Sequence, residues 1–516
     1  MINTLTDIIK NASEKFPENE AFKCGKKSLN FKEIDIKTNQ LAKYLQEAGV
    51  KKCDRVGIYM ERSVESVIAV YGILKAGAVF VPLDSTTPIS RTVFLLNDCN
   101  IEHLITTKLQ TKKTIKILEE EQPLTSIIGF EKELQITTVS WETIYTISLE
   151  NYAPVKIEKD DLAYIMYTSG STGLPKGIMH THFSGLSYAK LSAKLYQITE
   201  KDSVANLPPL HFDQATFGYF SSPLACATTV IIPDAYTKLP ASLSKLIEDE
   251  KITIWYSVPL ALIQLLQKGI LEDRNLTSLR WVLFGGEVFV TKYLYQLMQK
   301  WPQATFCNVY GPAEVNQCSY YHLDYTSTQK DPIPVGYIWD ETNYKILDKS
   351  DKEVPQGESG ELIINSTTMM RGYWNNETLT EKSFYNDGKK TYYRTGDIFN
   401  LNEKGELMFL GRNDSQVKIR GYRIEINEVE AVIANHSDID EAAVFAIETK
   451  EGVKELTAVI LLKQDKIMDK KTLFSYCKTL LPSYAIPTRI DIMEVFPRTS
   501  SAKIDRGALK RILIEA

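Results

Sequence analysis

The chain has 516 residues, which is more than one hydrophobic core ordinarily serves, so two or more domains are expected. Hydrophobic residues make up 44% and charged residues 24% of the chain, as in globular proteins, and the net charge of −5 argues against binding to nucleic acid or to an anionic membrane. Seven scattered cysteines without a Cys-x-x-Cys pair, and six histidines without metal-ligand spacing, argue against a disulfide framework and against zinc.

The N-terminal residues carry no basic stretch followed by an apolar one, so we expect no signal peptide. No apolar run in the sequence approaches the length of a bilayer span. Together with the scattered cysteines, these patterns predict a cytoplasmic protein without a membrane partner.

Short apolar runs and helical patterns alternate along the first four-fifths of the chain. A strand is expected at 56–59, a helix at 64–74 and a second strand at 78–83, and the same order recurs between residues 252 and 284. Such alternation indicates an α/β fold in which helices cover parallel sheets. Ligands bind at the strand ends of such sheets, where this chain has polar or Gly-rich turns.

The character of the sequence changes after about Gly411. A charged stretch, RNDSQVKIRGYRIEINEVE, leads into a region of roughly one hundred residues, which is within the size range of a small separate domain. We therefore predict a large N-terminal α/β domain over residues 1–412 and a small α+β domain over residues 413–516.

Residues 167–177, YTSGSTGLPKG, directly follow an apolar run at 162–166 and are predicted to bind phosphate. Three glycines free the backbone to turn its amide groups inward, while hydroxyls and a lysine add donors and charge. The spacing is not that of a Walker A loop, and the alternative is a flexible Ser/Gly turn at the surface. The predicted phosphate-binding residues are Thr168, Ser169, Gly170, Ser171, Thr172, Gly173 and Lys176.

Four later segments contain further candidate groups. In residues 308–314, NVYGPAE, the tyrosine beside Gly-Pro offers a face on which a base can stack, and the carboxylate four residues later can hold Mg²⁺. In residues 393–397, YRTGD, the aspartate can accept two ribose hydroxyls. Each pattern is, alone, also an ordinary turn. The other segments are 411–425 and 497–506, whose Lys503 would by itself be one of many surface lysines.

These five segments, in this order and spacing, resemble the superfamily of acyl-CoA synthetases, luciferases and peptide-synthetase adenylation domains. The resemblance extends to residues 74–84, 360–364, 371–375 and 481–487, and spans roughly residues 28–509. It implies the adenylate-forming fold, in which a large α/β domain of parallel sheets with flanking helices precedes a small mobile C-terminal domain. It also implies ATP and Mg²⁺ as cofactors, and a small carboxylic acid that is adenylated and then passed to a thiol.

The resemblance gives each motif a role. The loop at 168–176 would embrace the β- and γ-phosphates of ATP, and Glu314 would help to hold Mg²⁺. The catalytic residue would be Lys503, bridging the substrate carboxylate and the α-phosphate in the transition state. Asp414 would be the hinge about which the C-terminal domain rotates, bringing the segment at Gly421 to the active site for thioester formation. Adenine and ribose would contact Asn308, Tyr310, Asp397 and Arg412.

Two positions depart from the family pattern. The family usually has threonine where this chain has Ala313, so the hydroxyl that meets the α-phosphate is missing here. It usually has glycine before the catalytic lysine, where this chain has Ala502. Because Lys503 and Glu314 are retained we expect an active enzyme, and the alternative is a nucleotide-binding sensor of the same fold without turnover.

Asp213 is the predicted partner of a substrate α-ammonium group. The segment LHFDQATF at 210–217 resembles the adenylation-domain motif whose aspartate has this role, and synthetases for fatty or aryl acids do not need it. A buried cation requires such a partner. One alternative is that Asp213 caps a helix beginning near Gln214, and the other is that the enzyme is an acyl- or aryl-CoA synthetase.

The resemblance also aligns nine residues with the substrate pocket. Only Asp213 among them is charged, which favours a neutral amino acid. Phe217 and Leu283 would form apolar wall, and Gly285 would leave room. The run AEVNQC at 313–318 resembles stand-alone prolyl ligases that load carrier proteins, so L-proline is the predicted substrate, with a small polar one as the alternative. The nine residues are Asp213, Gln214, Phe217, Ser257, Leu283, Gly285, Val309, Gln317 and Cys318.

The acceptor thiol is expected to come from another molecule. The chain ends soon after Lys503, which leaves no room for a carrier domain with its own phosphopantetheine serine. We therefore expect a stand-alone enzyme of the peptide-synthetase type, as in secondary-metabolite biosynthesis. Its partner would be a separate carrier protein with a phosphopantetheine arm, or coenzyme A.

Overall fold

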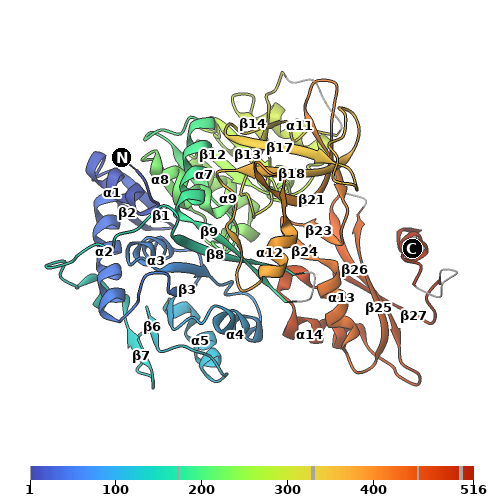
Figure 1. The fold of residues 1–516 in the computed structure, drawn as a ribbon, viewed down its shortest axis with the longest axis horizontal. Helices are drawn as coiled ribbons and strands as arrows, with labels where there is room; N and C mark the ends of the chain where they lie inside the picture. Colours follow the sequence, from blue (N-terminus) through green and yellow to red (C-terminus); the bar gives the residue numbers. More distant parts are fainter. Residues whose placement is uncertain (1, 171–173, 327–331, 450–451, 499–503, 516) are drawn as a thin grey trace. The chain divides into compact units, whose positions relative to one another are not determined.

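The structure, a computed structural model, describes residues 2–170, 174–326, 332–449, 452–498 and 504–515 (Figure 1). The chain folds into two compact units, and each is described by itself. The first unit comprises residues 1–85, 93–167 and 177–411, and the second comprises residues 86–92, 168–176 and 412–516. The domain boundary at 412–413 remains a prediction, and no sequence pattern indicates that the two short segments join the second unit.

Two sheets with mainly parallel strands form most of the first unit (Figure 1). Helical crossovers connect most of their parallel strands, which accounts for the alternation in the sequence. The nine-stranded sheet has the order β16 (Tyr337–Ile338), β15 (Ser319–Leu323), β14 (Thr305–Tyr310), β13 (Trp281–Gly285), β12 (Ile254–Ser257), β10 (Ser203–Asn206), β11 (Thr228–Ile231), β1 (Glu20–Cys24) and β2 (Lys27–Asn30). The eight-stranded sheet has the order β19 (Gly372–Tyr373), β9 (Lys176–Thr181), β8 (Leu162–Thr168), β4 (Val79–Pro82), β3 (Arg55–Tyr59), β5 (His103–Thr106), β6 (Ser126–Ile128) and β7 (Thr137–Val139).

A smaller antiparallel sheet precedes the second unit in sequence. Its strands follow the order β17 (Thr342–Leu347), β18 (Gly360–Ser366), β21 (Thr391–Leu401) and β20 (Phe384–Asn386), and β22 (Leu407–Arg412) pairs with β21. The α-helices before residue 412 are α1 (Thr6–Lys15), α2 (Phe31–Glu47), α3 (Val64–Lys75), α4 (Ile89–Asp98), α5 (Thr111–Leu118), α6 (Trp141–Tyr145), α7 (His182–Leu195), α8 (Ser222–Leu224), α9 (Pro240–Asp249), α10 (Pro259–Lys268), α11 (Thr291–Lys300) and α12 (Glu377–Ser383).

Local sequence signals start two of these helices. At α2 the Asn30 side chain accepts from the Glu33 amide at 2.8 Å, and the Glu33 carboxylate accepts from the Asn30 amide at 2.9 Å. Thr181 and Ser184 form the same reciprocal pair at the start of α7. Each reciprocal pair provides acceptors for two backbone amides that have no partner inside the helix. Losing such a cap typically lowers the free energy of unfolding by about 1 kcal/mol.

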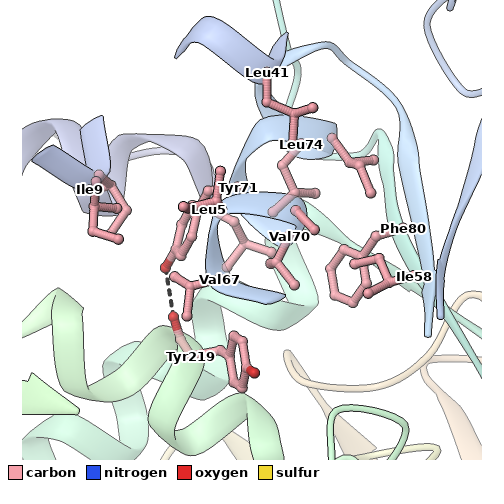
Figure 2. Packing of buried hydrophobic residues seen from close by; sticks show 14 of the residues in the cluster. Leu5, Ile9, Leu41, Ile58, Val67, Val70, Tyr71, Leu74, Phe80 and Tyr219 are labelled. Carbon is pink, nitrogen blue, oxygen red and sulfur yellow. Dashed lines mark hydrogen bonds between the residues drawn. The ribbon is translucent and has the colours of Figure 1, made fainter. Parts of the chain in front are cut away.

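A large hydrophobic core surrounds α3, in which every residue except Glu65 is buried, so nearly all of its surface is covered by other elements. Figure 2 shows Leu41 of α2 and Phe80 of β4 packed around it. The hydroxyl of Tyr71 on α3 donates to the backbone oxygen of Tyr219 at 2.6 Å (Figure 2). Because this bond pairs the fully buried hydroxyl of Tyr71, the hydroxyl does not destabilise the apolar core around α3.

The second unit has the α+β composition that the sequence predicts. Strands β23 (Gln416–Ile419) and β24 (Tyr422–Glu425) form a hairpin, and β25 (Ile439–Glu448), β26 (Lys454–Leu462) and β27 (Arg489–Met493) form a three-stranded sheet. Its helices are α13 (Ile426–Ala434), α14 (Lys470–Leu480) and α15 (Arg506–Glu515). Among the described residues of either unit, none of the helices is both long and apolar enough to cross a membrane.

Candidate active site

The predicted phosphate-binding segment begins at the last residue of β8 and ends at the first residue of β9. The Ser169 hydroxyl donates to the backbone oxygen of Arg423 at 2.8 Å, and the Thr168 hydroxyl oxygen is buried without a hydrogen-bond partner in the described part of the chain. A Cβ at Gly170 would lie 1.9 Å from the backbone oxygen of Leu174, so only glycine fits there. A tightly constrained backbone can present amide donors, and a buried hydroxyl without a partner among the described residues can donate as well. Both features are compatible with a phosphate ligand, whose oxygens accept hydrogen bonds.

The rest of this segment is described only in part. Ser171, Thr172 and Gly173 lie outside the described residues. Lys176 is half-buried, and its positive charge acts on Glu425. Burial raises the pKa of Glu425, and the Lys176 charge opposes that rise, so the ammonium group and this carboxyl interact within the second unit.

Tyr310 and Asp397, both predicted to bind adenosine, lie together in the first unit. The Tyr310 hydroxyl at the end of β14 donates to Oδ2 of Asp397 on β21 at 2.5 Å. The two residues are 6% and 2% exposed. Burial, followed by the negative charge of Asp397, raises the pKa of Tyr310 far above its ordinary value, so the phenol stays protonated. Asn308, two residues before Tyr310 on β14, donates from its amide to the backbone oxygen of Pro334 at 2.8 Å.

Glu314, the predicted Mg²⁺ ligand, follows β14 and is fully buried. Its Oε1 accepts from the hydroxyl of Tyr373 at 2.7 Å, and its backbone oxygen accepts from the Met370 amide at 2.7 Å. Within the described residues no group of three or more His, Cys, Asp or Glu side chains could hold a metal ion. Mg²⁺ is commonly held by one or two carboxylates together with substrate phosphates, and rarely by protein ligands alone. A single carboxylate at Glu314 therefore fits a Mg²⁺ ion that is also bound to the phosphates of ATP.

Asp213 lies half-buried in the loop between β10 and the short π-helix Phe217–Ser221. Ala215 and Thr216 are already helical and directly precede that π-helix, so the alternative in which Asp213 caps a helix beginning near Gln214 remains a prediction. Burial raises the pKa of three neighbouring phenols, and the negative charge of Asp213 raises it further. These phenols belong to Tyr164, Tyr188 and Tyr256. A carboxylate beside neutral phenols favours a cation, such as an ammonium group.

Three predicted pocket residues meet in one hydrophobic cluster, which we call the aromatic cluster. Phe217, Leu283 and Val309 pack there with four aromatic side chains that the sequence analysis did not identify: Tyr188, Tyr196, Tyr256 and Trp339. The sequence offered one weak signal for two of them, because Tyr188 and Tyr196 are eight residues apart and so lie near one face of a helix. No sequence signal pointed to Trp339, which comes from the strand β16 region.

Other predicted pocket residues have partners of their own. The Gln214 side chain bonds to the hydroxyl of Tyr256, while the Ser257 hydroxyl accepts from the indole of Trp255 at 2.8 Å. A Cβ at Gly285 would lie 2.4 Å from the backbone oxygen of Val309, its partner in the ladder between β13 and β14. The close approach of the two strands is therefore sufficient to require glycine at 285. Room for a substrate would be a second, separate reason for glycine at this position.

Gln317 and Cys318 lie in different surroundings. The Gln317 side-chain amide donates to the hydroxyl of Tyr196 at 2.6 Å and therefore adjoins the aromatic cluster. The Cys318 thiol lies 3.6 Å from the backbone oxygen of Tyr310 and packs in the separate cluster around that residue. The Gln317 side chain thus adjoins the aromatic cluster, whereas Cys318 contacts it through its backbone oxygen, which accepts from the Trp339 amide at 2.9 Å.

The predicted hinge and thioester segment lie in the second unit. Arg412 donates from two nitrogens to the two carboxylate oxygens of Asp414, at 2.7 and 2.6 Å. Although burial opposes it, this pairing holds the pKa of Asp414 below its usual value. Gly421 has φ of +80° in the turn between β23 and β24. The predicted catalytic Lys503 and its neighbour Ala502 lie outside the described residues.

Most of the chain matches known protein families. Residues 9–374 match the family described as AMP-binding enzyme, and residues 428–503 match the AMP-binding enzyme C-terminal domain. Gramicidin S synthase 2 of Brevibacillus brevis is 31% identical over 518 residues, covering 99% of this chain and 11% of that protein. Bacitracin synthase 2 of Bacillus licheniformis is 33% identical over 513 residues, covering 98% of this chain and 18% of that protein. The chain thus spans less than a fifth of the length of these curated relatives.

Solved structures have the same fold. The adenylation domain AlmE of Vibrio cholerae, in complex with glycyl-adenosine-5'-phosphate, matches with a TM-score of 0.86 and 25% identity over 100% of this chain and 99% of that one. The amide bond synthetase McbA from Marinactinospora thermotolerans matches with a TM-score of 0.88 and 20% identity, over 99% of each chain, which shows the fold alone. The predicted family and fold class are confirmed: the chain belongs to the AMP-binding enzyme family and has the fold of the adenylate-forming enzymes.

Proposed function

We propose that this chain uses ATP to convert a neutral amino acid into its aminoacyl adenylate and then transfers the acyl group to the thiol of a phosphopantetheine arm. The observation that carries the proposal is the Asp213 carboxylate among the neutral phenols of Tyr164, Tyr188 and Tyr256. An α-ammonium group bound there would gain a charged partner in partly desolvated surroundings. A fatty or aryl acid carries no ammonium group that this carboxylate could bind.

In the first step, a carboxylate oxygen of the amino acid attacks the α-phosphorus of ATP. The bond from that phosphorus to the oxygen that bridges it to the β-phosphorus breaks, and pyrophosphate leaves. The residues proposed to bind the β- and γ-phosphates include Thr168, Ser169 and Lys176, and Lys503 would stabilise the charge that develops around the α-phosphate. In the second step, a thiol loses its proton and attacks the acyl carbon, and AMP leaves.

The adenosine part of the adenylate is proposed to contact Asn308, Tyr310, Asp397 and Arg412. The hydrogen bond from Tyr310 supports this role for Asp397, because it orients the carboxylate before any ribose hydroxyl binds. Glu314 is proposed to hold Mg²⁺, which would neutralise part of the phosphate charge when bound. Asp414 is proposed to be the hinge for a rotation that brings the Gly421 segment to the acyl adenylate.

Among neutral amino acids, L-proline is the candidate that the sequence resemblance favours. The apolar side chains of Phe217, Leu283 and Val309 are compatible with its ring. The carrier is proposed to be a separate carrier protein, with coenzyme A as the alternative donor of the thiol.

The test is exchange of labelled pyrophosphate into ATP, measured with each of the twenty amino acids and with a panel of aryl and fatty acids. Exchange with one neutral amino acid is the expected result. Exchange only with acids that lack an α-amine would refute the amino-acid proposal and indicate an acyl- or aryl-CoA synthetase. Binding of ATP without exchange for any acid would indicate a nucleotide-binding sensor.

A variant tests the catalytic assignment. Lys503→Ala should reduce exchange by at least about a thousandfold, with ATP affinity changed by less than about tenfold, because the lysine acts on charge that develops in the transition state. Unchanged turnover in this variant would show that the assigned mechanism is wrong.

A further inference from the structure

Gln317 is a buried amide, and within the described part of the chain only one of its two polar atoms is paired. Its side chain is 3% exposed, and Nε2 donates to the Tyr196 hydroxyl at 2.6 Å. Its Oε1 is buried without a hydrogen-bond partner among the residues that the structure describes. An unpaired buried acceptor costs about 1–3 kcal/mol, so folded proteins rarely retain one that nothing else pairs with.

Trp339, a member of the aromatic cluster that Gln317 adjoins, also has a polar atom without a partner among the described residues. Trp339 is 4% exposed, and its ring stacks on Tyr188 with centroids 5.9 Å apart and planes inclined by 11°. Its indole Nε1 has no hydrogen-bond partner within the described ranges. The cluster that contains Phe217, Leu283 and Val309 is therefore adjoined by an unpaired acceptor and contains an unpaired donor.

We propose that the substrate side chain ends in a neutral group that both donates and accepts hydrogen bonds, a hydroxyl or a primary carboxamide, which pairs with Gln317 and Trp339. The proposal rests on the amino-acid adenylation proposed above and narrows its substrate class. It disfavours L-proline, whose ring carries no such group. Tyr196 is then a positioning residue, because its hydroxyl holds the Gln317 amide in place.

The neutrality of the group follows from its surroundings. Burial raises the pKa of Tyr188, Tyr196 and Tyr256 well above the ordinary value, so these phenols carry no charge at neutral pH. A charged side chain would find no opposite charge on the members of the aromatic cluster and would lose its hydration there. Turning the Gln317 amide by half a rotation exchanges its donor and acceptor, and a hydroxyl or a carboxamide pairs with either arrangement.

Matched substrates provide the test, because each pair has nearly the same shape and differs in polarity. Pyrophosphate exchange is measured for threonine against valine, asparagine against leucine, glutamine against methionine and serine against 2-aminobutyrate, with proline alongside. We expect one polar member to exceed its apolar partner about a hundredfold in kcat/KM, because a site built to hydrogen-bond a group rejects the analogue that lacks it.

Variants then connect that preference to the named residues. Gln317→Met should reduce the preference for the polar substrate to less than about tenfold, while Gln299→Met, at an exposed position on α11, should leave it unchanged. Tyr196→Phe should raise KM for the amino acid about tenfold with KM for ATP unchanged, whereas a merely structural role would alter both.

Two failures are distinguishable. No exchange with any amino acid would overturn the proposed function itself. Exchange in which proline or an apolar partner equals or exceeds every polar amino acid would leave adenylation standing and overturn the present inference. The same conclusion would follow if Gln317→Met kept the full polar preference.

Discussion

His180 makes the stability of the first unit sensitive to acid. The imidazole on β9 is 1% exposed and stacks on Tyr164 with centroids 4.9 Å apart. Its Nε2 donates to the backbone oxygen of Ala313 at 3.0 Å, which leaves Nδ1 to accept from the hydroxyl of Ser184 at 3.1 Å. Burial lowers its pKa to about 4. We predict that acidification destabilises the first unit through this residue and that His180→Gln removes that part of the effect.

The magnitude follows from the two pKa values. An unfolded histidine has a pKa of 6.5, so the unfolded chain binds the proton more tightly than the folded one. The stabilisation associated with the neutral imidazole is complete above pH 6.5 and is lost as the pH falls toward 4. Between pH 7 and pH 5 the loss is about 2 kcal/mol, out of about 3.4 kcal/mol for the full range.

The assay is urea unfolding at pH 7, 6 and 5, followed by tryptophan fluorescence. All six tryptophans lie in the first unit, so their emission reports on that unit alone. His182, whose pKa burial also lowers to about 4, is present in both proteins, so its contribution cancels in the difference between wild type and His180→Gln. Equal losses of stability in the two proteins between pH 7 and pH 5 would refute the reasoning.

Three further substitutions have defined outcomes. Asp213→Asn should lower kcat/KM for the amino acid at least about thirtyfold in the exchange assay, since it removes the charge that pairs with the ammonium group, and an equal loss in ATP affinity would contradict that role. Gly285→Ala should lower the free energy of unfolding by about 1–3 kcal/mol in the fluorescence assay, because its Cβ would meet the backbone oxygen of Val309 at 2.4 Å. A rise in KM with unchanged stability would instead mean that the glycine serves only the substrate. Tyr310→Phe should lower thermal stability, because the buried Asp397 carboxylate loses a donor at 2.5 Å, and an unchanged melting temperature would show that this bond contributes nothing net.

Much of the architecture follows from local patterns. Alternating apolar runs and helical periods predict parallel sheets covered by helices, and the structure has them. The order of the motifs predicts the family, which the comparisons confirm. The family resemblance aligns Phe217, Leu283 and Val309 with one substrate pocket, which stays a prediction, and the structure packs the three side chains in one hydrophobic cluster. The sheets and the family can be predicted from the sequence because hydrophobic period, motif spacing and motif order can be read along the chain without knowledge of distant contacts.

The pairing of polar groups across the site is decided by tertiary structure. The bond between Gln317 and Tyr196 joins residues 121 positions apart, and that between Tyr310 and Asp397 joins residues 87 positions apart. Neither local period nor composition says which distant side chain lies opposite, because strand register and helix packing set those distances. For the same reason, the sequence does not reveal that the register of β13 with β14 places the backbone oxygen of Val309 only 2.4 Å from where a Cβ at Gly285 would lie. Local chemistry thus specifies which groups the chain carries, and long-range packing specifies which of them are left for a ligand to satisfy.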